Sequence, residues 1–140
     1  MANNLKYSAA LKTARLGQVA TSVAGSCKID LYDGVQPASP DTAITTQNLL
    51  VECIGNATFT ATNTGGVLTA AAIATGTGTA VATSGGKTAT WGRISTSGGT
   101  AVVDFTVGAT SGFDMNCTPD SVIKTGTPFD IPTFTVTAGN

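Results

Sequence analysis

The chain of 140 residues contains no histidine, the side chain most often used for proton transfer near neutral pH. Neither a Ser-His-Asp nor a Cys-His arrangement can therefore form within it. Carboxylates remain, and Asp30, Asp33 and Asp41 lie close enough in the sequence to suggest a pair for glycoside cleavage or calcium binding. Asp33 precedes Gly34 and Asp41 follows Pro40, however, and aspartate in such places is typical of turns. We therefore expect no enzymatic activity and no catalytic residues.

The remaining motifs with possible chemistry are weak. The TGTGT run at 75–79 resembles a phosphate-binding loop, but no lysine follows at the required offset and no strand-to-helix switch surrounds it. The three cysteines, Cys27, Cys53 and Cys117, are widely and irregularly spaced, and without histidine the usual zinc ligand sets cannot form. Each lies in an apolar or strand-like run, which predicts buried, reduced thiols. We expect neither a metal nor a cofactor.

Trp91 is the one tryptophan and lies in a predicted strand, two residues before Arg93. A large aromatic side chain on a strand supplies much of the buried area of a small β-domain, so a role as core anchor is favoured. Tryptophan and arginine are also enriched at interface hot spots, which makes a partner contact the alternative. The two roles can coexist if one strand faces a partner.

The composition points to partners. Charged residues make up 11% of the chain, against roughly 25% in an ordinary soluble domain. Threonine, serine and glycine take their place, and this favours many short strands with turns. A free monomer normally needs a well-charged surface, so we expect neighbours to cover much of this one. The alternative is a monomer with a polar, threonine-rich face.

The charges are unevenly placed. Residues 1–29 carry four bases and no acid, whereas the rest of the chain carries three bases and eight acids. A basic segment on an acidic body suits docking to an acidic neighbour, including another copy of the chain. Four charges over 29 residues are too sparse for direct nucleic-acid binding. No secretory signal or membrane span is evident, so we expect synthesis in a cytoplasm and no membrane association.

Apolar residues recur near helical spacing from Leu5 to Val23, between a possible cap at Asn3 or Asn4 and a stop at Gly25. The apolar stripe is thin and rich in alanine, so we expect this helix to lie across a neighbouring surface. Together with the strand around Trp91 it supplies the predicted partner-binding residues, which are Lys6, Lys12, Arg15, Leu16, Trp91 and Arg93.

The remainder of the chain has the alternation of strands. The pattern predicts a strand over 27–32, an extended loop over 35–47 that contains two prolines, strand character over 48–64, and a hairpin over 87–108 that turns at 97–99. Short strands are expected near 113–117, 121–124 and 133–137. Residues 67–84 fit either two short strands or a flexible loop. We predict a mainly β fold, an antiparallel β-sandwich or barrel-like (jelly-roll or immunoglobulin-like) domain over 26–140, preceded by a helix or arm over 1–25.

The order of several segments resembles small structural proteins of tailed phages that are encoded near the head genes. These segments are LKYSAALKTARL near the start, YDGVQPASPDTA at 32–43, ATWGRISTSGGTAVVDFTVG at 89–108, and the closing FTVTAGN at 134–140. The resemblance covers most of the chain except 67–86. It implies a virion setting, and it brings no catalytic residues with it.

Two functions follow as hypotheses. The first is a capsid cement or decoration protein on the capsid surface, with the major capsid protein and other copies of itself as partners. The helix or arm would reach over a neighbouring subunit and stabilise the head. The second is a tail or fibre-associated module that binds host surface glycans, with exposed Trp91 and Tyr32 beside Asp30 as the sugar platform.

Overall fold

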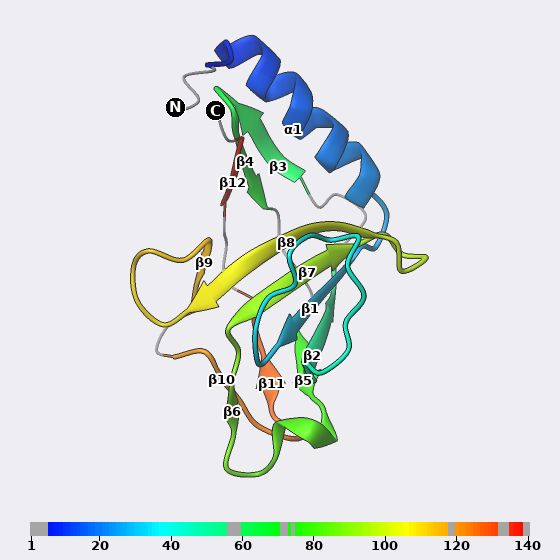
Figure 1. Ribbon diagram of the computed structural model, residues 1–140, viewed down its shortest axis with the longest axis vertical. Coiled ribbons are helices and arrows are strands. Elements are labelled where there is room, and N and C mark those ends of the chain that lie inside the picture. Colours follow the sequence, from blue (N-terminus) through cyan, green and yellow to red (C-terminus); the bar gives the residue numbers. More distant parts are fainter. Residues whose placement is uncertain are drawn as a thin grey trace.

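The computed structural model describes residues 6–55, 60–70, 73, 75–117, 120–131 and 135–138. Within these residues the chain forms one α-helix, one short 3-10 helix and twelve strands, arranged as a large curled sheet with two smaller sheets (Figure 1). The prediction of a mainly β fold with one N-terminal helix is confirmed. The predicted alternation of side chains is also found in the central strands, where residues two positions apart, such as Ile29 and Leu31, enter the core.

The large sheet has the strand order β11-β5-β2-β1-β7-β8-β9. All its neighbours are antiparallel except β8 and β9, which are parallel. At its centre β1 lies between β2 and β7, and β7 and β8 form the predicted hairpin. The strands are β1 (Lys28–Tyr32), β2 (Leu49–Ile54), β5 (Gly76–Gly78), β7 (Trp91–Ser95), β8 (Ala101–Gly108), β9 (Met115–Asn116) and β11 (Pro128–Phe129).

The smaller sheets lie at opposite ends of the molecule in Figure 1. At one end, β6 (Lys87–Thr88) pairs with β10 (Val122–Ile123). At the other end, β4 (Val67–Ala70) lies between β3 (Thr60–Thr64) and β12 (Thr135–Thr137). Helix α1 (Ala9–Val23) packs over β3 and β4 and contacts β8.

Helix α1 begins later than the sequence predicts. Its N-cap is Ser8, whose hydroxyl accepts a hydrogen bond from the backbone N–H of Leu11 at 3.2 Å. The expected caps Asn3 and Asn4 lie outside the described residues. Leu16 and Val23 are buried in the same cluster as the large sheet, so the inner stripe of the helix belongs to the chain's own core and is not an arm on a neighbour.

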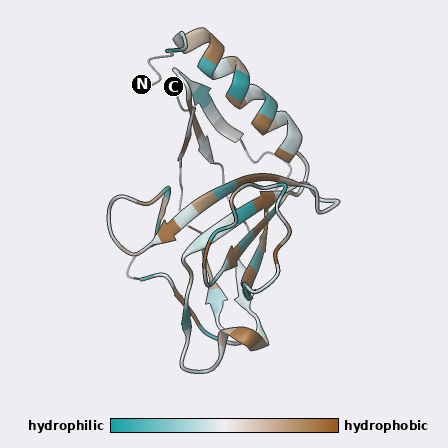
Figure 2. Ribbon diagram, viewed as in Figure 1, coloured by the Kyte–Doolittle hydropathy of each residue, from teal (hydrophilic) through white to brown (hydrophobic). Residues whose placement is uncertain are grey.

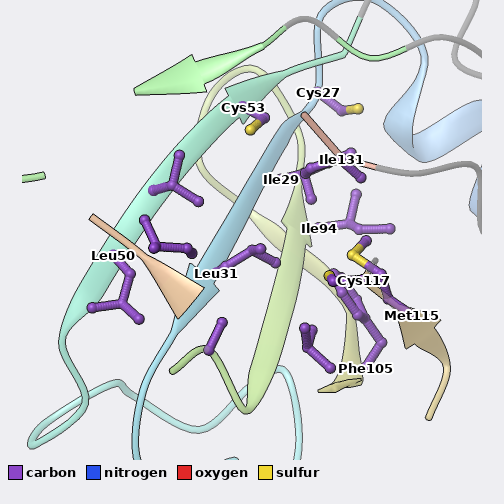
Figure 3. Packing of buried hydrophobic residues seen from close by; sticks show 14 of the residues in the cluster. Cys27, Ile29, Leu31, Leu50, Cys53, Ile94, Phe105, Met115, Cys117 and Ile131 are labelled. Carbon is purple, nitrogen blue, oxygen red and sulfur yellow. The ribbon is translucent and has the colours of Figure 1, made fainter. Parts of the chain in front are cut away.

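The core lies on one face of the large sheet. Apolar residues recur along β1, β7 and β8 (Figure 2), and the side chains of Ile29, Leu31, Ile94 and Phe105 meet there (Figure 3). A bulge between β1 and β2 places Leu50 in the same cluster. The opposite face of these strands carries the polar and aromatic side chains of the candidate site.

The undecided stretch 67–84 contains two strands, β4 and β5, followed by the 3-10 helix η1 (Ala80–Ala82). The glycines of TGTGT are explained by close approach within a sheet. A Cβ at Gly76 would overlap Cys53 and Val51 of β2, and one at Gly78 would overlap the backbone carbonyl of Lys124. The discounted phosphate-binding loop is therefore a short strand of the large sheet.

The cysteines are buried free thiols, as predicted. Burial raises the pKa of Cys27, and it raises the pKa of Cys53 and of Cys117 to about 11. Because the thiolate is the reactive form, we expect the folded protein at pH 8 to react with a disulfide reagent such as DTNB on the order of a hundredfold more slowly than the unfolded chain. A spectrophotometric thiol titration with and without guanidinium checks this. Rapid labelling of any cysteine in the folded protein would contradict it.

Candidate functional site

Two aromatic rings stack on the outer face of the large sheet, away from the core. Tyr32 at the end of β1 and Trp91 at the start of β7 are cross-strand partners, with ring centroids 4.5 Å apart and planes inclined by 14°. The indole Nε1 donates a hydrogen bond of 3.1 Å to the backbone carbonyl of Asp33. Both rings are buried, with Tyr32 7% and Trp91 1% exposed. The rings anchor a second, smaller packed layer on this face.

Arg93 connects this layer to the next strand. Its Nε donates to Asp104 Oδ1 at 2.7 Å and its Nη2 donates to Asp104 Oδ2 at 2.9 Å, a bidentate pair between adjacent strands. Its guanidinium carbon also lies 5.6 Å from the centroid of the Trp91 ring, within the range of a cation–π contact. The side chains of Arg93 and Asp104 are 8% and 3% exposed. The hydrogen bonds to Asp104 raise the pKa of Arg93.

The layer is sealed by the loop between β1 and β2, residues 33–48, which we call the cover loop. Arg93 Nη2 donates to two carbonyls of this loop, Ser39 at 3.4 Å and Thr42 at 3.3 Å. At the base of the loop, Asp33 accepts hydrogen bonds from the backbone N–H of Asn48 at 2.7 Å and from its side chain. Lys87 completes the base with an ion pair of 3.4 Å to Asp33. The cover loop is thus held along its length.

Asp30 lies in this layer without a complete set of partners. Its Oδ2 accepts a long hydrogen bond of 3.4 Å from the Tyr32 hydroxyl, whereas its Oδ1 is buried with no hydrogen-bond partner. Burial, with the negative charge of Glu52 on the paired position of β2, raises the pKa of Asp30 to about 6. Lys28 and Arg93 act in the opposite direction. The charged form of Asp30 is therefore disfavoured in the folded chain.

Comparison with protein-family models, curated proteins and solved structures finds no match for this chain.

Within the ranges described above, no three His, Cys, Asp or Glu side chains gather closely enough to hold a metal ion. No helix in that part of the chain is long and apolar enough to span a bilayer.

Unlike the outer layer, several side chains near the start of the chain are exposed to solvent. Leu11 is 46% exposed on the outer side of α1, and Arg15 lies one turn further along the helix, with its guanidinium carbon 4.9 Å from the centroid of the Tyr7 ring. Lys6 is also exposed. We call Tyr7, Leu11 and Arg15 the helix stripe. It combines an exposed leucine with a tyrosine and an arginine, and the last two residue types are enriched at interface hot spots.

The predicted partner-binding residues fall into two groups. Lys6, Lys12 and Arg15 lie on or just before α1, where contact with a partner stays a prediction. Leu16, Trp91 and Arg93 are buried within the chain, at 4%, 1% and 7% exposure. A partner could contact the last two only if the cover loop moved. For Trp91 the role as an anchor is confirmed, although in the outer layer and not in the main core.

The exposure expected of the sugar platform is wrong. It required exposed Trp91 and Tyr32 rings beside Asp30, but all three residues are buried. Sequence reasoning also missed Asp104, Tyr7 and Leu11. Asp104 could not be predicted from the hairpin, because strict pairing about the turn at 97–99 places Val103 opposite Arg93, and Asp104 takes that position only through the register shift between Ile94 and Ser95.

Proposed function

We propose that the protein is a capsid cement protein of a tailed phage, bound on the outside of the head across neighbouring copies of the major capsid protein. The observation that carries the proposal is where the few charges of the chain lie. Seven of the 15 charged residues either belong to three ion pairs among the described residues or, like Asp30, are buried, and exposed threonines are frequent on the rest of the surface. A surface of this kind is suited to lie against neighbours.

Three ion pairs account for much of the charge. They join Lys28 to Glu52 at 3.0 Å, Lys87 to Asp33 at 3.4 Å, and Arg93 to Asp104 at 2.7 Å. Asp30 is buried as well. Exposed threonines instead cover the short strands and their flanks, among them Thr75, Thr77, Thr88, Thr90, Thr135 and Thr137. Threonine presents a methyl group and a hydroxyl, which can pack and hydrogen-bond against a protein surface without the desolvation of a charge.

The proposed mechanism is assembly and not chemistry. Each copy would bury an interface of ordinary size, about 1,600 Å² in total, against shell subunits. Shell symmetry would repeat that contact many times, so a modest affinity per copy would give a large gain in shell stability. The rigid outer layer under the cover loop would keep the contacting surface in one conformation and so limit the entropy lost on binding.

The test uses phage heads that lack this protein. We expect such heads to lose DNA at a lower temperature and after a milder osmotic shock, and purified protein to restore both properties at a fixed number of copies per head. Cryo-electron microscopy should place the added density on the outer shell. An unrelated acidic protein of similar size serves as the control for nonspecific protection. Heads that are equally robust without the protein, with its density confined to the tail, would overturn the proposal.

A further inference from the structure

We infer that copies of this chain bind one another head to tail, the helix stripe of one copy docking on an acidic, aromatic flank of the next. The flank is formed by Phe113 and Asp114 in the loop between β8 and β9. This inference rests on the proposed function, in which many copies act together on one shell, and the experiment below separates the two.

Leu11 and Arg15 of the helix stripe are exposed in the described part of the chain. The opposite side of α1 is already committed, because Leu16 and Val23 are buried in the core. The outward side carries Leu11 with nearly half of its surface in solvent, and Arg15 is held in place by the Tyr7 ring. No acid lies between Lys6 and Lys28, so the stripe and its surroundings are positively charged.

The flank has the complementary character. Phe113 is 41% exposed, and its ring lies directly on Gly108, where any side chain would overlap it. Asp114 is fixed beside it, because its Oδ2 accepts hydrogen bonds of 2.8 Å from both the backbone N–H and the hydroxyl of Thr106. Asp120, the next acid along the chain, is exposed too. An apolar ring is thus presented beside negative charge on a supported loop.

The other exposed apolar residues do not offer such a match. Five large apolar side chains are exposed in the described part of the chain, and they are Leu11, Val35, Ile54, Val81 and Phe113. Ile54 lies beside the Lys28–Glu52 pair, and Val35 lies near the Asp33–Lys87 pair, so the charges around them are already neutralised. Leu11 lies one helical turn from Arg15, and Phe113 lies next to Asp114, and neither Arg15 nor Asp114 belongs to the three ion pairs. A contact between the helix stripe and the flank would place apolar side chains against each other and positive charge against negative charge.

The positions of the two surfaces make the contact intermolecular. Helix α1 lies at the top of Figure 1, and the loop between β8 and β9 projects from the left side of the large sheet. Because α1 is packed on β3 and β4, it does not reach that loop in the same copy. A contact between two different surfaces is heterologous, so it closes into a ring or continues as an array, depending on the rotation between copies.

Sedimentation velocity on the purified full chain over a range of concentrations tests the inference. We expect self-association that weakens when salt is raised from 50 mM to 500 mM. Arg15→Glu should weaken it by at least tenfold, and so should Asp114→Arg. The double variant, with the charges exchanged, should recover much of the loss. Lys124→Glu makes the same charge change at an exposed base away from both surfaces and should associate as the unmodified chain does.

Because Asp114 holds Thr106, the thermal unfolding of each variant is recorded, and Phe113→Ser provides a second variant of the flank that leaves Asp114 in place. A monomeric protein at 200 μM, or a double variant no better than the single ones, would overturn the inference. Cosedimentation with heads that lack the protein distinguishes this inference from the proposed cement function. If unmodified protein binds heads but shows no self-association, only this inference fails. If it self-associates but binds no heads, the cement function fails.

Discussion

Replacing Arg93 by methionine is expected to lower the free energy of unfolding by about 3–5 kcal/mol, because it leaves the carboxylate of Asp104 buried and without its counter-charge. The Asp104 side chain is 3% exposed and receives both of its strong hydrogen bonds from Arg93. The substitution also removes the two bonds to the cover loop and the contact with Trp91. Urea unfolding followed by circular dichroism measures the change.

Two further variants identify the cause. The double variant Arg93→Met with Asp104→Leu removes both charges and should recover a large part of the loss, since a buried pair replaced by apolar residues is often close to neutral. Lys28→Met breaks the Lys28–Glu52 pair, whose side chains are 35% and 38% exposed, and should cost far less, because solvent screens this pair. Equal losses for Arg93→Met and Lys28→Met would contradict the assigned role of the Arg93–Asp104 pair.

The alternation of the sequence predicted the central strands well, for a physical reason. Ile29 and Leu31 on β1 face the core, as do Ile94 and Phe105 on the hairpin, and burial of one face imposes a repeat of two residues. The short strands expected near 113–117 and 121–124 are also found, as β9 and β10. The two-residue strand β11 was not predicted, because it is too short to show a repeat and its position depends on pairing with the distant β5.

The outer layer could not be predicted from the same pattern. Alternation assigns Tyr32 and Trp91 to the face opposite the core, and for most antiparallel sheets that face is in solvent. Here the cover loop lies over it, and a loop with two prolines and no repeat gives no indication of which surface it covers. Leu16 is a further case. The helical spacing placed it on the apolar stripe, which was expected to contact a partner, but Leu16 is buried in the chain's own core.

The outer layer also explains how a chain with few charges keeps one defined conformation. Its charges are used where strands and loop must be held in register, as Arg93 links β7 to β8 and to the cover loop. What remains outside is a threonine-rich β-surface that carries exposed acids such as Asp114 and Asp120, with a basic helix at one end. In the proposed self-association, the contacts between copies would therefore depend on a few residues, chiefly Leu11, Arg15 and Phe113.

Asp30→Asn is expected to stabilise the protein at neutral pH by up to about 3 kcal/mol, which corresponds to a shift of roughly two pKa units. The pKa of Asp30 is raised from its ordinary value of 3.8 to about 6 in the folded chain. Between these values the folded state binds more protons than the unfolded state, so this group makes stability fall as pH rises from about 4 to about 6. Above pH 6 the buried carboxylate is ionised beside Glu52, with Oδ1 unpartnered.

The amide removes this charge while keeping the shape of the side chain, so its advantage should depend on pH. We expect the difference in unfolding free energy between Asp30→Asn and the unmodified chain to be largest above pH 6, to decline on acidification, and to vanish below about pH 4, where both side chains are neutral. Urea unfolding of the two proteins from pH 3.5 to pH 8 measures it, and other titrating groups cancel in the difference. Asp33→Asn serves as the contrast, because hydrogen bonds from Asn48 and the nearby Lys87 lower the pKa of that carboxyl, so its loss should destabilise the chain most at neutral pH. A constant difference for Asp30→Asn across this range would show that the carboxylate is solvated when folded, and that the cover loop does not seal the face of the sheet on which it lies.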